Sequence, residues 1–239
     1  MKLVEIELDL PYQKNQNFID EVLKNGILEY QEATRQDYES NWKEKRRNFQ
    51  LMTRCMTSMI ERIMEPTVTE ECWKIIVECV EKQARKEYSN LLGAYVIQVE
   101  FDYNMFLTAD DYSKKKMVID TILKGIKKLS NCISFDFNNI VDACKQVADN
   151  GYINEWLWGK TIRLKGKNAR VKIKHEISKV DILIAFIDRD NQCIKEELII
   201  SAIPDERAYA QYLGKLERVS EDVVALIDKS GKELKRVHC

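Results

Sequence analysis

Glycine, proline and histidine are scarce in this chain. Its 239 residues include eight glycines, three prolines and two histidines. So little glycine and proline excludes long flexible linkers and collagen-like or low-complexity segments. The 38 basic and 39 acidic residues leave a net charge of −1. That balance argues against a dedicated nucleic-acid coat and against an acidic mimic of DNA.

Long hydrophobic runs are also missing. No stretch of about 18 uncharged apolar residues occurs, so the sequence predicts no membrane span. Glu5, Glu7 and Asp9 interrupt the first ten residues, which therefore lack the apolar region of a signal peptide. We expect a cytoplasmic protein.

The seven cysteines form no C-x-x-C pair, and their number is odd. Several lie in apolar segments, where a free thiol behaves as a small hydrophobic side chain. A structural zinc site needs about four closely spaced Cys or His ligands, and the two histidines, His175 and His238, lie far apart in the sequence. The sequence therefore predicts reduced thiols, no metal site and no other cofactor.

Two segments resemble ligand-binding loops, but neither is complete. Gly159-Lys160-Thr161 resembles the end of a phosphate-binding loop, yet Asn154 stands where that loop needs a glycine. Residues 188–192 resemble the start of a calcium loop, but Cys193 and Ile199 occupy its glycine and glutamate positions. A nucleophile elbow and a dinucleotide fingerprint are also missing, so we predict no catalytic residue. Carboxylates that only the fold brings together remain an open route to catalysis.

Hydrophobic periodicity predicts mainly helices in the first two-thirds of the chain. An apolar stripe at three- and four-residue steps indicates a long helix over 34–64 that stops before Pro66. Residues 72–80 are short and apolar, and they fit either a strand or a buried helix. Alternation predicts strands at 2–9 and 94–101, and apolar stripes predict further helices at 16–31, 113–129 and 136–149.

The last third has a different pattern, with short apolar segments separated by turn residues. It predicts strands at 160–165, 169–175, 180–187 and 193–202, a short helix at 205–213, and a hairpin of 222–228 with 232–237. Helices followed by strands indicate an α+β fold and argue against a parallel βαβ fold. We expect one domain over 1–239, in which a helical part packs with an antiparallel meander. Its possible lobes are 1–157, mainly helical, and 158–239, mainly β.

One segment carries an unbalanced charge. Between residues 159 and 175 there are seven basic residues and no acid, and alternation places most of them on one face of a predicted hairpin. Such a basic ribbon can follow phosphates or dock an acidic protein surface. It can also be a solvated face neutralised by Glu176, Glu196 and Glu197. The candidate partner-binding residues are Arg163, Lys165, Arg170, Lys172 and Lys174, with Trp156 and Trp158 as anchors or as packing residues.

Five segments of the chain carry a resemblance to known proteins. They are 42–54 (WKEKRRNFQLMTR), 90–106 (NLLGAYVIQVEFDYNMF), 110–126 (DDYSKKKMVIDTILKGI), 152–160 (YINEWLWGK) and 202–216 (AIPDERAYAQYLGKL). Together they resemble a family of bacterial immunity-type partners of polymorphic toxins. The resemblance implies a cytoplasmic protein that binds and neutralises a toxin domain, and it assigns no contact residue. Immunity proteins often carry a strong charge opposite to that of their toxin, and a net charge of −1 departs from that pattern.

Three functions follow as alternatives. The first is a non-catalytic protein that binds a toxin domain with fixed stoichiometry. The second is a nucleic-acid-binding protein that uses the basic ribbon, although this segment has no interleaved aromatic residues for base stacking. The third is an enzyme whose carboxylates assemble only in the fold.

Overall fold

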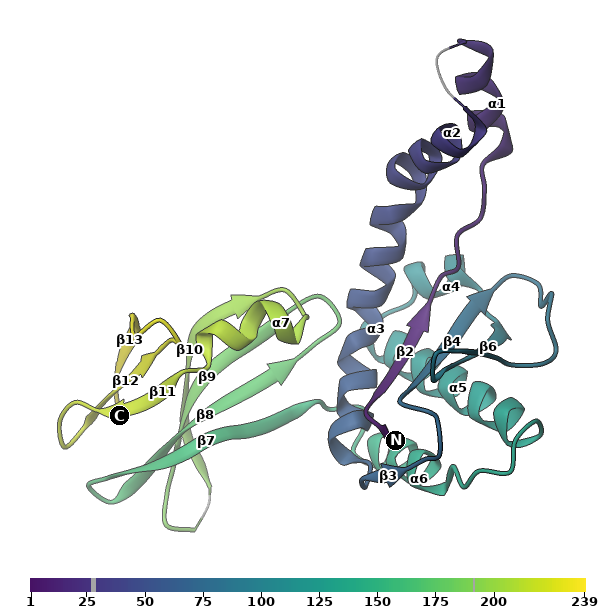
Figure 1. Ribbon diagram of the computed structural model, residues 1–239. Coiled ribbons are helices and arrows are strands. Elements are labelled where there is room, and N and C mark those ends of the chain that lie inside the picture. The colour runs from purple at the N-terminus through teal and green to yellow at the C-terminus, as the bar shows by residue number, and fades with distance from the viewer. Residues whose placement is uncertain (27–28, 191) are drawn as a thin grey trace. The chain divides into compact units, whose positions relative to one another are not determined.

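The computed structural model describes residues 1–26, 29–190 and 192–239. The chain divides into two compact units, Met1–Tyr152 (unit 1) and Ile153–Cys239 (unit 2), each with its own sheets (Figure 1). The mixed α+β class and the antiparallel sheets are confirmed. The two units are described separately below.

Unit 1 contains a four-stranded sheet with the order β2-β4-β6-β5. The segment 72–80, which the sequence left open, supplies a strand with partners on both sides. The strands are β2 (Glu5–Asp9), β4 (Lys74–Val80), β5 (Ser89–Leu91) and β6 (Ala94–Glu100), and a separate short pair joins β1 (Lys2–Leu3) to β3 (Thr67–Val68). β2, β4 and β6 are parallel, whereas β5 pairs with β6 as an antiparallel hairpin.

This sheet corrects two expectations. A helical first two-thirds is wrong, since strands occur throughout the chain, and unit 1 holds the parallel pairing that the sequence argued against. Parallel neighbours need a long crossover connection, which the helices between β2 and β4 supply. A central parallel strand is buried on both faces and loses its two-residue alternation. In β6, six of the seven residues are buried.

The helices of unit 1 follow the apolar stripes. They are α1 (Gln16–Lys24), α2 (Tyr30–Asp37), a π-helical turn η1 (Tyr38–Trp42), α3 (Lys43–Ile63), α4 (Tyr103–Thr108), α5 (Asp111–Ser130) and α6 (Asn138–Asp149). The predicted helix 34–64 therefore corresponds to the end of α2, η1 and α3. The predicted helix 16–31 is shorter, because α1 ends at Lys24, and residues 27–28 lie outside the described part. Asn15, Asp102 and Asp110 cap helices with their side chains.

The core of unit 1 lies between the sheet and its helices, with α5 packed closely on one face of the sheet and buried apolar residues also on α3 and α6. Apolar side chains that pair in register, such as Leu8, Val77 and Ile97, line this face of β2, β4 and β6, because residues paired across neighbouring strands point to the same face. Gly125 of α5 lets the helix approach closely, since a Cβ atom there would lie 2.8 Å from Val77 and 3.5 Å from Ile97. Within the described residues, none of the helices has the length and apolar character needed to cross a membrane.

Unit 2 consists of two antiparallel sheets. The first has the order β10-β9-β8-β7, with β7 (Glu155–Leu164), β8 (Lys167–His175), β9 (Val180–Ile187) and β10 (Cys193–Ala202). The second joins β11 (Lys215–Arg218), β12 (Val223–Ile227) and β13 (Glu233–His238), and α7 (Glu206–Tyr209) with a 3₁₀ turn (Ala210–Tyr212) precedes it. The predicted meander and last hairpin are present, and β11 is a strand that the sequence pattern did not predict.

The inner faces of the two sheets share one apolar core. Ile173, Ile182, Ile184 and Phe186 from the first sheet are fully buried, and Val224 from the second is buried with them. Because side chains alternate along a strand, the residues between these core positions form the opposite face of the first sheet. That outer face contains most of the predicted basic ribbon.

Candidate functional site

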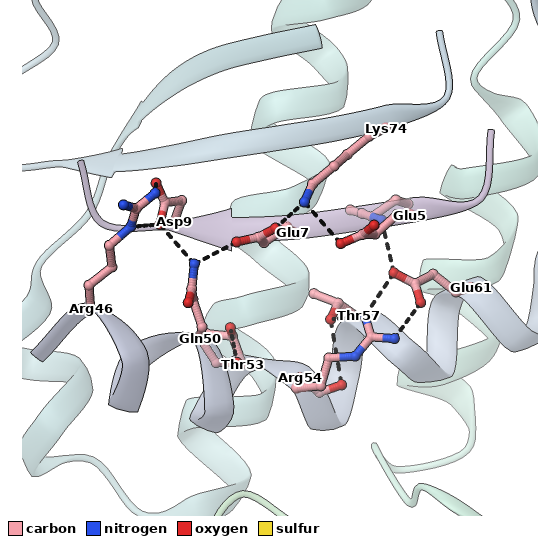
Figure 2. Close-up of polar contacts among 11 residues, drawn as sticks. Glu5, Glu7, Asp9, Arg46, Gln50, Thr53, Arg54, Thr57, Glu61 and Lys74 are labelled. Carbon is pink, nitrogen blue, oxygen red and sulfur yellow. Dashed lines mark hydrogen bonds and ion pairs between the residues drawn. The ribbon is translucent and has the colours of Figure 1, made fainter. Parts of the chain in front are cut away.

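Three carboxylates line one face of β2 in unit 1. Ile6 and Leu8 point into the core, so alternation places Glu5, Glu7 and Asp9 together on the opposite face (Figure 2). The acids that interrupt the N-terminal apolar segment therefore form a row along a strand at the edge of the sheet.

Helix α3 supplies a matching polar stripe beside β2. Arg46, Gln50 and Arg54 are four residues apart and lie on one side of the helix (Figure 2). Arg46 binds Asp9 through two bonds, with Nε 2.6 Å from Oδ1 and Nη2 2.7 Å from Oδ2. Gln50 donates from Nε2 to Glu7 at 2.6 Å and to Asp9 at 3.1 Å. Arg46 therefore neutralises one carboxylate of the acidic row, and Gln50 donates hydrogen bonds to two of them.

Lys74 of β4 completes the network. Its Nζ lies 2.9 Å from Glu5 Oε1 and also contacts Glu7 Oε2. Burial lowers the pKa of Lys74, but its bonds to Glu7 and Glu5 outweigh that effect and raise the pKa. Farther along α3, Arg54 donates to both oxygens of Glu61, at 2.9 and 2.7 Å.

Glu61 also closes the exposed edge of β2. Its Oε1 accepts the backbone N–H of Ile6 at 2.9 Å (Figure 2). An edge strand presents unpaired backbone groups that can bind other chains, and the carboxylate of Glu61 satisfies one of them. This part of the network has a structural role that the sequence pattern did not suggest.

The carboxylates of this row are therefore bound within unit 1. Over residues 1–26, 29–190 and 192–239, no group of three or more His, Cys, Asp or Glu side chains is placed to hold a metal ion. Asp110, which is followed by a second acid, Asp111, also has a structural role. Its Oδ1 accepts the Ser113 N–H at 2.8 Å and so caps α5. The charges of the row stabilise contacts between elements.

A shallow pocket of about 480 Å³ lies at the carboxyl ends of β4 and β6. Lys45 on α3 lines it, and the Lys45 Nζ lies 4.4 Å from the ring centroids of both Trp42 and Tyr103. An ammonium group between two aromatic faces is stabilised by cation–π attraction. Further lining residues are Glu81, Glu100, Phe101, Asp102 and Asn104.

The outer face of the first sheet of unit 2 holds the predicted ribbon. Strand register places Leu157, Lys172, Leu183 and Leu198 side by side across β7, β8, β9 and β10. Leu157 is 38% exposed and Leu198 is 45% exposed. Three leucines therefore share one row of this face with Lys172, and the middle leucine, Leu183, is buried. The sequence indicated this face only as basic.

Acids beside this row pair with the lysines of the ribbon. Lys172 Nζ lies 2.6 Å from Glu155 Oε2 and 2.7 Å from Glu196 Oε1, and Lys174 Nζ lies 2.6 Å from Glu196 Oε2. The hydrogen bonds from Lys172 and Lys174 lower the pKa of Glu196 from its ordinary 4.5 to about 2. Glu196 is one of the acids that the sequence offers as neutralisers of the ribbon. Glu155 is a second neutralising acid, and alternation from Leu157 places it on the same face.

The remaining predicted site residues are divided between two faces. Arg163 pairs with Asn168, lies on the outer face of the sheet and is exposed. Lys165 is exposed in the turn that follows β7. Arg170 is half-buried, and its Nη2 lies 3.4 Å from the Gly159 carbonyl oxygen.

The two tryptophans lie on the other side of the sheet. Trp156 and Trp158 pair with Ile173 and Val171, which are core residues, and both rings pack against the core of unit 2. They are half-buried. The tryptophans therefore lie on the opposite face of the sheet from Lys172 and Lys174, and they pack against the core of unit 2.

No protein-family model, curated protein or solved structure matches this chain in the three comparisons.

Proposed function

We propose that this chain is a cytoplasmic, immunity-type protein that binds a toxin domain and neutralises it by stoichiometric contact. The observation that carries the proposal is the outer face of the first sheet in unit 2. On that face three leucines lie in one row with Lys172, whose ion pairs with Glu155 and Glu196 are already formed within the chain. Exposed apolar side chains beside polar groups are typical of protein interfaces.

Charge balance favours a protein partner over a nucleic acid. Strand register places four cations and three carboxylates on this face, namely Arg163, Arg170, Lys172 and Lys174 with Glu155, Asp181 and Glu196, and Lys179 from the preceding turn contacts Asp181. Binding to phosphates depends on cations that can release counterions. Here Lys172 and Lys174 already contact Glu155 and Glu196, so these two cations of the ribbon are less available to a phosphate backbone.

Two further points support a binding role. The packing of Trp156 and Trp158 beneath the sheet gives the face a rigid base, which reduces the entropy lost on binding. The resemblance to immunity-type proteins supplies the kind of partner. The carboxylate row of unit 1 has its own structural partners, which weakens the enzyme alternative.

Purification of the tagged chain from its native cells tests the proposal. We expect one protein in fixed stoichiometry that stops growth when expressed alone and is harmless when co-expressed with the chain. Reversal of the lysines would also break the ion pairs with Glu155 and Glu196, so the leucines are the better targets. The double variant Leu157→Glu/Leu198→Glu should lose both binding and rescue.

The control is Val219→Glu, which places the same charge on another apolar residue of unit 2 that is 45% exposed. It should bind and rescue as the unmodified chain does. Equal behaviour of the two variants would remove the proposed face. Recovery of nucleic acid without a protein, with affinity that falls steeply as salt rises, would overturn the protein-binding function.

A further inference from the structure

The turn between β5 and β6 contains an unusual residue. Leu91 pairs with Ala94, so Leu92 and Gly93 are the two central residues of a tight hairpin. Both have positive φ angles, +53° and +85°. Turns of this geometry favour Asn-Gly, because asparagine tolerates the left-handed region. A leucine there brings its Cβ too close to the following carbonyl oxygen.

Leu92 gains no burial in return for this strain. Its side chain is 97% exposed, and the neighbouring Leu91 is 61% exposed. Leucine is therefore unfavourable here for two reasons: the turn prefers other residues, and the hydrophobic effect favours burial of an apolar side chain. Strained backbone that the surrounding structure maintains is concentrated at functional sites.

The surrounding residues hold the turn firmly. Trp73 donates from Nε1 to the Leu92 carbonyl oxygen at 3.0 Å, and its backbone N–H donates to the Gly93 carbonyl at 2.9 Å. Gly93 N–H donates to Asn90 Oδ1 at 2.8 Å. A Cβ at Gly93 would lie 2.6 Å from the Glu71 carbonyl oxygen, so the backbones are in close contact. Leu92 is therefore presented from a rigid base.

The surroundings of Leu92 indicate the chemistry of its ligand. Trp73 is 37% exposed, and Val4, whose N–H donates to the Trp73 carbonyl at 3.0 Å, is 52% exposed. These residues extend an apolar surface beside the turn. Glu70 and Glu71, in the segment whose backbone touches Gly93, are exposed. The Glu71 carboxylate accepts from the Tyr95 hydroxyl at 3.1 Å, and the N-terminal ammonium lies 3.5 Å from the Glu70 carbonyl oxygen, so the two carboxylates are the acidic groups of this segment.

We propose that Leu92 is an interface anchor that inserts into a leucine-sized apolar pocket of a partner protein, with basic groups of that protein facing Glu70 and Glu71. Residues that dominate binding fill desolvated pockets near the centre of an interface, and a rigid anchor loses little entropy when it binds. The inference goes beyond the proposed function, because it assigns a contact to unit 1 and does not require the outer face of unit 2.

Photo-crosslinking in the native cells tests the inference. The photoreactive amino acid p-benzoylphenylalanine is placed at position 92 in one variant and at position 198, on the outer face of unit 2, in another. We expect a single adduct with one other protein from position 92. That protein is then purified and titrated with the unmodified chain and with Leu92→Asn.

Leu92→Asn should weaken the affinity by roughly tenfold or more, while its melting temperature rises by about 2–4 °C because asparagine suits the turn. A loss of binding in a more stable protein cannot come from unfolding. The matched control is Met105→Asn, at an exposed apolar residue of α4, which should leave the affinity unchanged.

Three results would overturn the inference: no adduct from position 92, an adduct of two copies of this chain, or equal affinity of Leu92→Asn and the unmodified chain. An adduct from position 198 without one from position 92 would leave the proposed function standing and remove this inference. The reverse result would support Leu92 and count against the outer face of unit 2.

Discussion

Arg46 on α3 and Asp9 at the end of β2 form a two-bond ion pair that joins the long helix to the edge of the sheet. The Asp9 side chain is 8% exposed and the Arg46 side chain is 36% exposed. The hydrogen bonds to Asp9 raise the pKa of Arg46 above its ordinary value, against the effect of its partial burial. A planar guanidinium matches a carboxylate at two points, which a lysine cannot do.

Asp9→Asn should therefore destabilise unit 1. The substitution leaves the Arg46 charge partly buried without its carboxylate, and we expect a loss of about 2 kcal/mol in the free energy of unfolding. Urea unfolding measures it. The control is Glu39→Gln, which breaks an exposed pair with Lys43 and should cost less than about 0.5 kcal/mol. Equal losses in the two variants would show that the pair contributes no more than a surface contact.

The ion pairs of Glu196 predict acid sensitivity in unit 2. The pKa of Glu196 is lowered from 4.5 to about 2 in the folded chain, so the folded state favours the ionised form. Its contribution to stability is complete above about pH 4.5 and is lost as the pH falls toward 2. Urea midpoints between pH 6 and pH 2 should fall more steeply for the unmodified chain than for Glu196→Gln.

Glu217→Gln is the control for this pH dependence. Glu217 pairs with Lys215 on an exposed strand, and its removal should leave the steep decline in place. If Glu196→Gln declines as steeply as the unmodified chain, Glu196 is not the group that loses its contribution in acid.

Local pattern explains which elements could be predicted from the sequence. Residues 113–129 have a clear apolar stripe and an N-cap at Asp110, and α5 covers Asp111–Ser130. The meander of unit 2 also follows from alternation and turn residues. The parallel pairing of β2 with β4 could not be predicted in this way, because it joins segments that are separated by the helices α1 to α3. Continuous burial of β6 hides the alternation that would mark its faces.

In the candidate site, too, local pattern predicted some features, while others depend on contacts between distant segments. Alternation correctly placed Lys172 and Lys174 on one face of the ribbon. Their partner Glu196 lies on β10, two strands away from β8, so sequence neighbours could not decide whether these charges were free. The tryptophans were open to either interpretation, because only the pairing of Trp156 with Ile173 shows which face they occupy.

Gly125 tests the close packing of α5 on the sheet. Gly125→Ala should raise helix propensity by about 1 kcal/mol, but the added methyl would lie 2.8 Å from Val77 Cγ2. Overpacking of this kind costs roughly 1–3 kcal/mol, so we expect net destabilisation of unit 1 in urea unfolding. Lys124→Ala, at an exposed neighbouring position of the same helix, should have little effect. A more stable Gly125→Ala would show that Val77 moves aside freely.

Asp37 joins the extended segment after β2 to α2. Its side chain is buried, and it accepts bonds from the Tyr12 hydroxyl at 2.5 Å, the Asn15 N–H at 2.8 Å and Asn41 Nδ2 at 2.7 Å. Burial favours the neutral acid, but these three donors outweigh it and lower the pKa of Asp37 below its ordinary 3.8. The ionised carboxylate is therefore the form that stabilises this junction, and acid weakens it below about pH 4.

Asp37→Asn should loosen this junction without unfolding the rest of unit 1. An amide places an N–H group against donors and leaves at least one of them unsatisfied, at a cost of about 1–3 kcal/mol. Hydrogen exchange measured by mass spectrometry should be faster over the described parts of residues 12–37 and unchanged over 43–63, because α3 keeps its own packing on the sheet. Asp20→Asn, which alters an exposed bond to Gln16 on α1, should leave both regions unchanged. Faster exchange across α3 as well would mean that Asp37 supports the whole unit and not only the junction.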